Sequence, residues 1–392
     1  MNDENKDILD SGGFIIPKAN KNDNLEDFDY QKVQSVLNRM SAYWATSKGI
    51  PRASDPEYSK VRSAFIELSQ IKDAPKNIDN ELNYISNDYT MQIEDIHKSF
   101  KDNNLVLILG AGVSRDNGLP TWSKLLEEIS INCFEDIPEE HRKPLFNYLQ
   151  GQTGSLIYAR MIKAEFRTKN KCLEDEISNE LYSKVNKDKE QGTLKEIVDF
   201  CLYEKFSPRA IITYNYDNLL EFFIEKRGGN SIFEPIVSIG QKTKKIPIYH
   251  VHGYLPMEGD IKSIVILNEE EYHRIYADNT DWRNLKQIDI FRECTCLFIG
   301  HSLTDPNLRR LLDANTGNEN LYAIIMEPNH KGILEHYKKK DKTVFINEAV
   351  LTEKKLREYD AESLNVKILW AKNNKELSSM LRQIKKGIKN DG

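Results

Sequence analysis

The chain has 392 residues, of which 39% are hydrophobic and 30% are charged, and its formal net charge at pH 7 is −6. The hydrophobic share is sufficient for a buried core, so extended disorder is excluded. The length suits one large domain with additions or two domains, because single cores stop growing at ~250–300 residues. The acidic balance argues against a protein that coats nucleic acid, and we expect no direct nucleic-acid partner.

No apolar stretch approaches the ~18–20 residues that a membrane span needs. The first ten residues, MNDENKDILD, have neither the basic nor the apolar region of a secretory signal, so we expect a cytoplasmic protein with no membrane partner. The five cysteines are scattered, and only Cys294 and Cys296 are close together. They do not form a disulfide framework or complete a tetrahedral zinc site, so we expect buried, reduced thiols and no metal.

The N-terminal part of the chain differs in character from the rest. Residues 1–27 are polar and predict a flexible tail. Apolar residues with helical spacing at 33–40 and 61–68 predict a helical extension over 28–103. The region 123–207 has long charged stretches and few strand signals, which predicts a helical insertion of about that extent.

From residue 104 onward, short apolar runs alternate with helical patterns. The run LVLILG (105–110) is continuously apolar, as expected of a strand buried on both faces of a parallel sheet. This alternation predicts an α/β fold with a mostly parallel sheet. The expected strands are 105–110, 210–215, 246–253, 263–268, 295–300, 321–327 and 366–371.

A glycine-bearing loop, GAGVSRDNGLP (110–120), follows the first strand. Glycines let a backbone approach a pyrophosphate closely, and amides at a helix entry attract its charge. The usual dehydrogenase fingerprint is not met, because Arg115 interrupts it and no strand with a terminal acid follows ~20 residues later. Hydride transfer is therefore not the predicted chemistry.

Two further strands end in polar residues. TYNYD (213–217) places an amide and a carboxylate two residues apart, although Asn and Asp are also common helix N-caps. In HVHG (250–253), strand alternation would point His250 and His252 to the same side. A histidine at a strand end is a candidate general base; a two-histidine metal site or a core histidine without a role are the alternatives.

The loop GHSLTDPN (300–307) follows a fifth apolar strand. Asp305 before Pro306 predicts a helix start, with Asp305 as a structural N-cap. Gly300, His301 and Ser302 would then lie between strand and helix, where they could contact a nucleotide. Asn268 with Glu271 three residues later predicts another helix start, through a capping box.

Together, the ordered motifs GAGVSRDNGLP, TYNYD, HVHG and GHSL resemble the sirtuin (silent-information-regulator-type) family over roughly 104–392. The resemblance implies a Rossmann-like domain. Deacetylating sirtuins carry a zinc ribbon with two cysteine pairs after the His-Gly motif, whereas 254–299 here contain only Cys294 and Cys296. The chain is therefore more similar to the sirtuin-like NAD hydrolases of bacterial anti-phage systems, and we expect no zinc ribbon.

The resemblance also implies residue roles. Asn215 would contact the nicotinamide ribose and orient the attacking water, His252 would act as the base, and Asp217 would hold the nicotinamide carboxamide. The remaining NAD-binding residues would be Gly110, Ala111, Gly112, Ser114 and Pro120 of the glycine-rich loop, with Gly300 and Ser302 on the phosphate and adenosine side.

The function that follows is hydrolysis of NAD to nicotinamide and ADP-ribose, with NAD as substrate and no metal, depleting NAD during infection. An NAD-dependent protein-lysine deacylase and a non-catalytic nucleotide sensor or assembly subunit are the alternatives. Family members often act as homo-oligomers or with a partner such as a HerA-like ATPase, so we expect a homo-oligomer and name a HerA-like ATPase as the candidate partner.

Overall fold

The computed structural model describes residues 88–388 except 230, 260–264, 279, 316 and 329–342, and it leaves out the side chains of 343–348. The chain divides into two compact units. The larger one contains Tyr89–Met326 and Ala361–Gly392, and the smaller one Met1–Asp88 and Glu327–Asp360. The predicted tail (1–27) and the helical patterns at 33–40 and 61–68 lie outside the described residues.

A seven-stranded sheet forms the centre of the larger unit, in the order β3-β4-β2-β1-β5-β6-β7. Every pair of neighbouring strands is parallel. The prediction of a Rossmann-like, mostly parallel α/β fold is therefore confirmed. The strands are β1 (Leu105–Leu109), β2 (Ala210–Thr213), β3 (Phe233–Ile236), β4 (Ile246–His250), β5 (Thr295–Ile299), β6 (Leu321–Met326) and β7 (Val366–Ala371).

The central strands are apolar because helices cover both faces of the sheet. Every residue of β1, β2 and β5 is buried. Alternate residues of β1 enter different clusters: Leu105, Leu107 and Leu109 lie in one, and Val106 and Ile108 in the other. Burial of a side chain of this size contributes about 1.5–3 kcal/mol, so the two clusters together hold the sheet in place.

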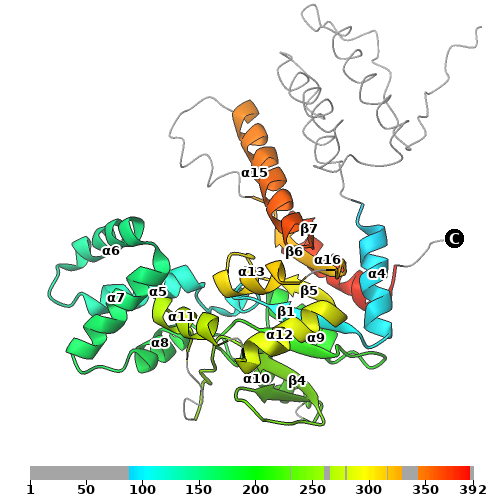
Figure 1. Cartoon of the computed structure of the whole chain (residues 1–392), viewed down its shortest axis with the longest axis horizontal. Coiled ribbons are helices and arrows are strands. Elements are labelled where there is room, and N and C mark those ends of the chain that lie inside the picture. Colours follow the sequence, from blue (N-terminus) through cyan, green and yellow to red (C-terminus); the bar gives the residue numbers. More distant parts are fainter. Residues whose placement is uncertain are drawn as a thin grey trace, which may run out of the picture. The chain divides into compact units, whose positions relative to one another are not determined.

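Helices of the larger unit pack against the sheet, and α5 to α8 pack on one another as a group at one side of this unit (Figure 1). This group lies within the predicted helical insertion. The helices are α4 (Thr90–Lys101), α5 (Trp122–Cys133), α6 (Glu139–Thr153), α7 (Ser155–Thr168), α8 (Leu173–Tyr182), α9 (Gly192–Cys201), α10 (Leu219–Lys226), α11 (Glu269–Ala277), α12 (Trp282–Glu293), α13 (Pro306–Asp313), α15 (Thr343–Ser363) and α16 (Asn374–Lys386), with a 3₁₀ turn η1 (Arg115–Asn117).

The predicted strand at 263–268 is wrong for its described part, because 265–268 form no strand. Val265, Ile266 and Leu267 are buried, but they lie in a loop that leads to the cap of α11. The strand that the prediction missed is β3, FEPI, whose Glu234 and Pro235 do not form an apolar run. An apolar run indicates that its residues are buried, but the run at 265–267 is buried in a loop and not in a strand.

The strand order reverses at β1, which has β2 on one side and β5 on the other. Leu109, the last residue of β1, pairs with Thr213 of β2 and Ile299 of β5, and Thr213 pairs with His250 of β4. Four neighbouring strands thus end at the same level. Ligands of open α/β sheets bind at the carboxyl ends of the strands where the order reverses. All four polar loops predicted from the sequence start at this edge.

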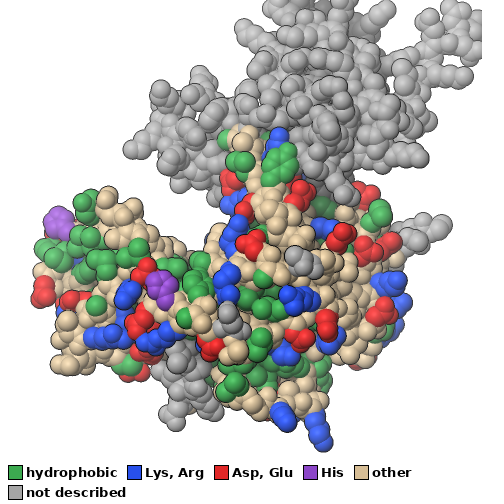
Figure 2. Space-filling view, in the orientation of Figure 1, with side chains coloured by type: hydrophobic (Ala, Val, Ile, Leu, Met, Phe, Trp, Pro, Cys, Tyr) green, Lys and Arg blue, Asp and Glu red, His purple; other side chains and the backbone are tan. Residues whose placement is uncertain are grey.

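On the face drawn in Figure 2, acidic and basic side chains are interspersed over the described residues. No helix in the described part of the chain is long and apolar enough to cross a bilayer. All five cysteines are free, and four are buried, whereas Cys172 is exposed, contrary to the expectation of five buried thiols.

Candidate functional site

The glycine-rich loop after β1 is locked to the loop after β5. The amide of Gly110 donates to the carbonyl of Ile299 at 3.0 Å, and that of Gly112 donates to Gly300 at 2.9 Å. A Cβ on Gly110 would lie 2.6 Å from the Gly300 carbonyl oxygen, and one on Gly112 would lie 2.8 Å from the Gly300 Cα. Gly300 has φ +63°, a conformation that favours glycine. Glycine at these three positions therefore allows the loops after β1 and β5 to lie this close together.

Asn117 holds the far end of the glycine-rich loop, a role that the sequence analysis did not identify. Its Nδ2 donates to the carbonyls of Asn186 at 3.1 Å and Lys189 at 3.0 Å, and its Oδ1 accepts from the Gln191 amide at 2.8 Å. Asn117 is fully buried. The loop is thus fixed at both ends, as preorganised ligand binding requires.

Ser114 and Asp217 form a buried contact between the loops after β1 and β2. The Ser114 hydroxyl donates to the Asp217 carboxylate at 3.2 Å from Oδ1 and 3.3 Å from Oδ2, and the Leu219 amide donates to Oδ1 at 3.1 Å. Burial raises the pKa of Asp217 to about 6, although these donors oppose the shift. The Asp217 oxygens can accept hydrogen bonds from a ligand amide, as the predicted carboxamide contact requires.

Asn215 also connects the loops after β2 and β1. Its Nδ2 donates to the carbonyl of Gly110 at 3.2 Å, and its backbone amide donates to the Thr213 hydroxyl at 3.1 Å. Its Oδ1 is buried and has no hydrogen-bond partner. An unsatisfied buried acceptor costs about 1–3 kcal/mol, so such an atom at a strand end is a candidate ligand contact.

The two histidines of the third motif have no partner in common. Strand β4 ends at His250, so the strand alternation on which the prediction rested does not extend to His252. The Nε2 of His250 contacts Glu221 Oε1 of α10 at 2.6 Å. The Nε2 of His252 lies 3.4 Å from Oδ2 of Asp305, at the start of α13. The two histidine rings therefore contact different residues, His250 a glutamate of α10 and His252 an aspartate at the start of α13.

Aromatic rings and a carboxylate surround His252. Its ring centroid lies 4.6 Å from that of Tyr214 and 5.9 Å from that of Tyr272, in edge-on contacts. Burial lowers the pKa of His252, with Arg283 acting in the same direction and Asp305 opposing them. The lowered pKa favours the neutral ring, which is the form that can accept a proton. Because Tyr214 precedes Asn215, the predicted base and the predicted amide lie at neighbouring strand ends.

His301 is a second neutral histidine at this edge. Its Nδ1 accepts from the Leu303 amide at 2.9 Å, and its ring lies edge-on to Tyr214 with centroids 4.8 Å apart. Burial lowers the pKa of His301 to about 4. The adjacent Ser302 is exposed, and its hydroxyl pairs with that of Thr304 at 2.7 Å.

The structure thus brings together most of the predicted residues, through Gly110–Asn215, Gly112–Gly300, Ser114–Asp217 and Tyr214–His252 contacts. Ala111 and Pro120 are half-buried in the glycine-rich loop. The contacts of Asp305 and Tyr272 with His252 were not predicted from the sequence. Asp305 showed only an N-cap signal, and no local pattern linked it to a histidine 53 residues earlier.

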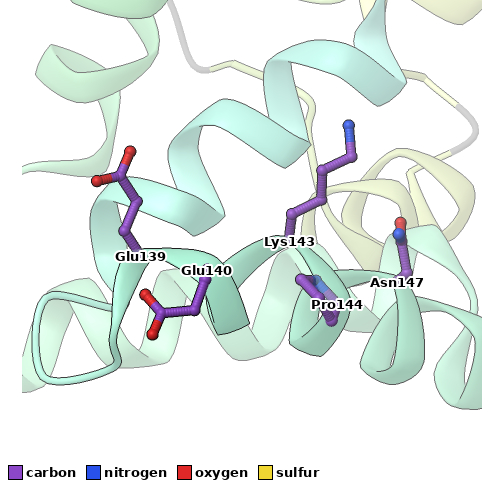
Figure 3. A pocket seen from close by; sticks show the side chains of 5 residues that line it. All are labelled: Glu139, Glu140, Lys143, Pro144 and Asn147. Atoms are coloured by element: carbon purple, nitrogen blue, oxygen red, sulfur yellow. The ribbon is translucent and has the colours of Figure 1, made fainter.

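A pocket on the surface lies elsewhere. Its lining residues, Glu139, Glu140, Lys143, Pro144 and Asn147, all come from α6 (Figure 3). None of the four strand-end loops contributes to it, so it is not the candidate dinucleotide site. Among the described residues, no group of three or more His, Cys, Asp or Glu side chains could hold a metal ion.

Comparison with known proteins supports the resemblance. Residues 209–359 match the family described as a SIR2-like domain. The chain is 25% identical over 230 residues to defense-associated sirtuin 2 of Bacillus subtilis, an alignment that covers 58% of this chain and 21% of that protein.

Two proteins named NAD(+) hydrolase ThsA are also similar. The one from Bacillus cereus (strain MSX-D12) is 24% identical over 311 residues, which are 76% of this chain and 57% of that protein. The one from Acinetobacter baumannii (strain 532279) is 24% identical over 226 residues, which are 57% of this chain and 41% of that protein. The chain thus spans less than two thirds of each relative.

Proposed function

We propose that the chain, whose residues 209–359 match the SIR2-like domain family, hydrolyses NAD⁺ at the nicotinamide–ribose bond, giving nicotinamide and ADP-ribose, in defence against phage. Similarity to proteins named NAD(+) hydrolase and defense-associated sirtuin supports this proposal. A homo-oligomeric state and a partner ATPase stay predictions.

The observation that carries the proposal is a buried acceptor without a hydrogen-bond partner at the edge of the sheet where the strand order reverses. It is Oδ1 of Asn215, and the ring of His252 lies at the neighbouring strand end, in edge-on contact with Tyr214. The unsatisfied oxygen costs the free protein about 1–3 kcal/mol. Such atoms are retained where a ligand or a reaction uses them.

In this reaction the nicotinamide of NAD⁺ is already a pyridinium, so its departure needs no general acid. The bond between ribose C1′ and the ring nitrogen breaks, and its electron pair stays on nicotinamide. Water oxygen bonds to C1′, and one water proton passes to a base and then to solvent. The requirement is a positioned water and stabilisation of an oxocarbenium-like transition state.

The residues of the site match these requirements. The amide of Asn215 can orient the water and contact the ribose, and the neutral ring of His252 can accept the proton, a contribution typically ~10²–10⁴-fold. Asp217, held by Ser114, can accept from the nicotinamide carboxamide. The interlocked loops of Gly110, Gly112 and Gly300 can bring backbone close to the diphosphate.

The test is chromatography of NAD products formed by the purified chain, alone and in phage-infected lysate. We expect nicotinamide and ADP-ribose in equal amounts, and a loss of about 10²-fold or more in Asn215→Ala and His252→Ala. His141→Ala is the matched control, because the side chain of His141 is 69% exposed on α6.

Three outcomes would contradict the proposal. Turnover that depends strictly on an acylated peptide would indicate a deacylase. NAD binding by calorimetry without products in either condition would indicate a sensor. Unchanged turnover in both site variants, each with a wild-type unfolding curve, would refute the site itself.

A further inference from the structure

We propose that Asp305 is a positioning residue for His252, orienting the ring and deciding which of its nitrogens carries the proton. The inference rests on the proposed function, because it concerns the base of that reaction. It assigns to Asp305 a second role beside the helix cap predicted from the sequence.

The two carboxylate oxygens of Asp305 have different partners. Oδ1 accepts from the Leu308 amide at 2.7 Å, which is the N-cap bond of α13. Oδ2 accepts a hydrogen bond from the Tyr272 hydroxyl of α11 and lies 3.4 Å from Nε2 of His252. A cap needs only the first oxygen. The second therefore joins the helix start to the side chains of two other segments.

Packing restricts the ring of His252 to this arrangement. Its side chain is 9% exposed and that of Asp305 10%. Edge-on contacts with Tyr214 and Tyr272 flank the imidazole, so rotation away from the carboxylate would disturb both rings. The Tyr272 hydroxyl donates a hydrogen bond to Asp305, which holds the Tyr272 ring in place as well. One carboxylate thus restrains the ring and one of its neighbours.

A carboxylate can only accept hydrogen bonds, so the nitrogen of His252 that faces it is the one that carries hydrogen. With the proton on Nε2, the lone pair of a neutral imidazole is on Nδ1, which becomes the proton acceptor. After the ring has taken the proton of the attacking water, the Asp305 charge stabilises the imidazolium. In serine-protease triads a buried aspartate likewise holds the tautomer and orientation of the histidine and stabilises the imidazolium.

The pH dependence of His252 reflects the groups that face it. These are Asp305 of α13, Tyr272 of α11, Tyr214 after β2, His301 after β5 and Arg283 of α12. Among them only Asp305 favours the charged ring, whereas Arg283 and burial disfavour it. Removal of the Asp305 charge should therefore shift protonation of His252 to lower pH.

The first test compares Asp305→Asn and Asp305→Ser with the wild type. Both replacements are good N-caps, so α13 should still form. We expect kcat for nicotinamide release to fall about tenfold or more with a small change in KM. In Asp305→Asn, the acidic limb of the pH–kcat profile should move to lower pH. Wild-type kcat in Asp305→Ser, or an unmoved acidic limb, would overturn the proposal.

A second readout does not depend on turnover. In ¹⁵N-histidine-labelled protein, the signal of His252 is assigned by its loss in His252→Ala. We expect hydrogen on Nε2 in the wild type, and a lower pKa with a changed tautomer population in Asp305→Asn. Identical His252 spectra in the two proteins would overturn the role of Asp305, whereas an inactive wild type with the expected spectra would reject only NAD hydrolysis.

Discussion

Replacing Gly112 by alanine tests the contact between the glycine-rich loop and the loop after β5. The new Cβ would lie 2.8 Å from the Cα and 2.9 Å from the carbonyl oxygen of Gly300, where ordinary contact begins at 3.4 Å. The loops must therefore separate by about 0.6 Å, which stretches the Gly112–Gly300 bond, now 2.9 Å long. Overpacking and the weakened bond together should cost about 2–4 kcal/mol.

Gly151→Ala is the matched control for this change. Gly151 lies in α6, and a Cβ there meets nothing within 4 Å, so the control should stabilise the protein by about 0.5–1 kcal/mol. Urea unfolding measures both variants, and nicotinamide release measures the site. We expect Gly112→Ala to lose turnover as well as stability. If it keeps wild-type stability and turnover, the interlocked-loop explanation of the glycines is wrong.

Two further predictions concern charge. Because the folded-state pKa of Asp217 is raised to about 6, its contribution to stability is complete at low pH and is lost as the pH rises through 6. Asp217→Asn removes this loss, so from pH 4 to pH 8 the wild type should weaken relative to the variant by roughly 2 kcal/mol in urea unfolding. In α7, Lys163 pairs with buried Glu271, so Lys163→Met should cost about 1–3 kcal/mol. Arg167 of the same helix pairs with Glu270, and its side chain is 64% exposed. Arg167→Ala should therefore cost at most about 0.5 kcal/mol.

Each of these has a clear contrary result. A stability difference between wild type and Asp217→Asn that does not change with pH would mean that Asp217 keeps an ordinary pKa. Equal losses in the α7 variants Lys163→Met and Arg167→Ala would mean that burial of Glu271 does not strengthen its pair.

Much of the fold could be predicted because local patterns report it. Continuous apolar runs such as 105–110 indicate strands buried on both faces, and six of the seven predicted strands coincide with strands of the sheet. Helix starts were also predictable. Asp305 with Pro306 caps α13, and Asn268 with Glu271 forms the capping box of α11, as expected. Capping involves residues only two or three positions apart, so short sequences contain the whole interaction.

Other features depend on partners far along the chain. The apolar run at 265–267 is buried without strand pairing, because Ile266 donates its amide to the carbonyl of His252 and accepts at its own carbonyl from the Tyr216 hydroxyl. The different partners of His250 and His252 follow from the place where β4 ends. Neither could be predicted from residue spacing, since spacing does not identify a contact beyond a few residues.

The sequence by itself determined the kinds of elements, their helix starts and the four polar loops that follow strands. Only the tertiary structure decided that these loops are neighbours, because the order β4-β2-β1-β5 results from long-range pairing of apolar strands. That order places the carboxylate of Asp305 against the ring of His252, although 53 positions separate them. Periodicity and caps are local, whereas the electrostatics of a buried side chain depend on whatever the folded chain packs against it.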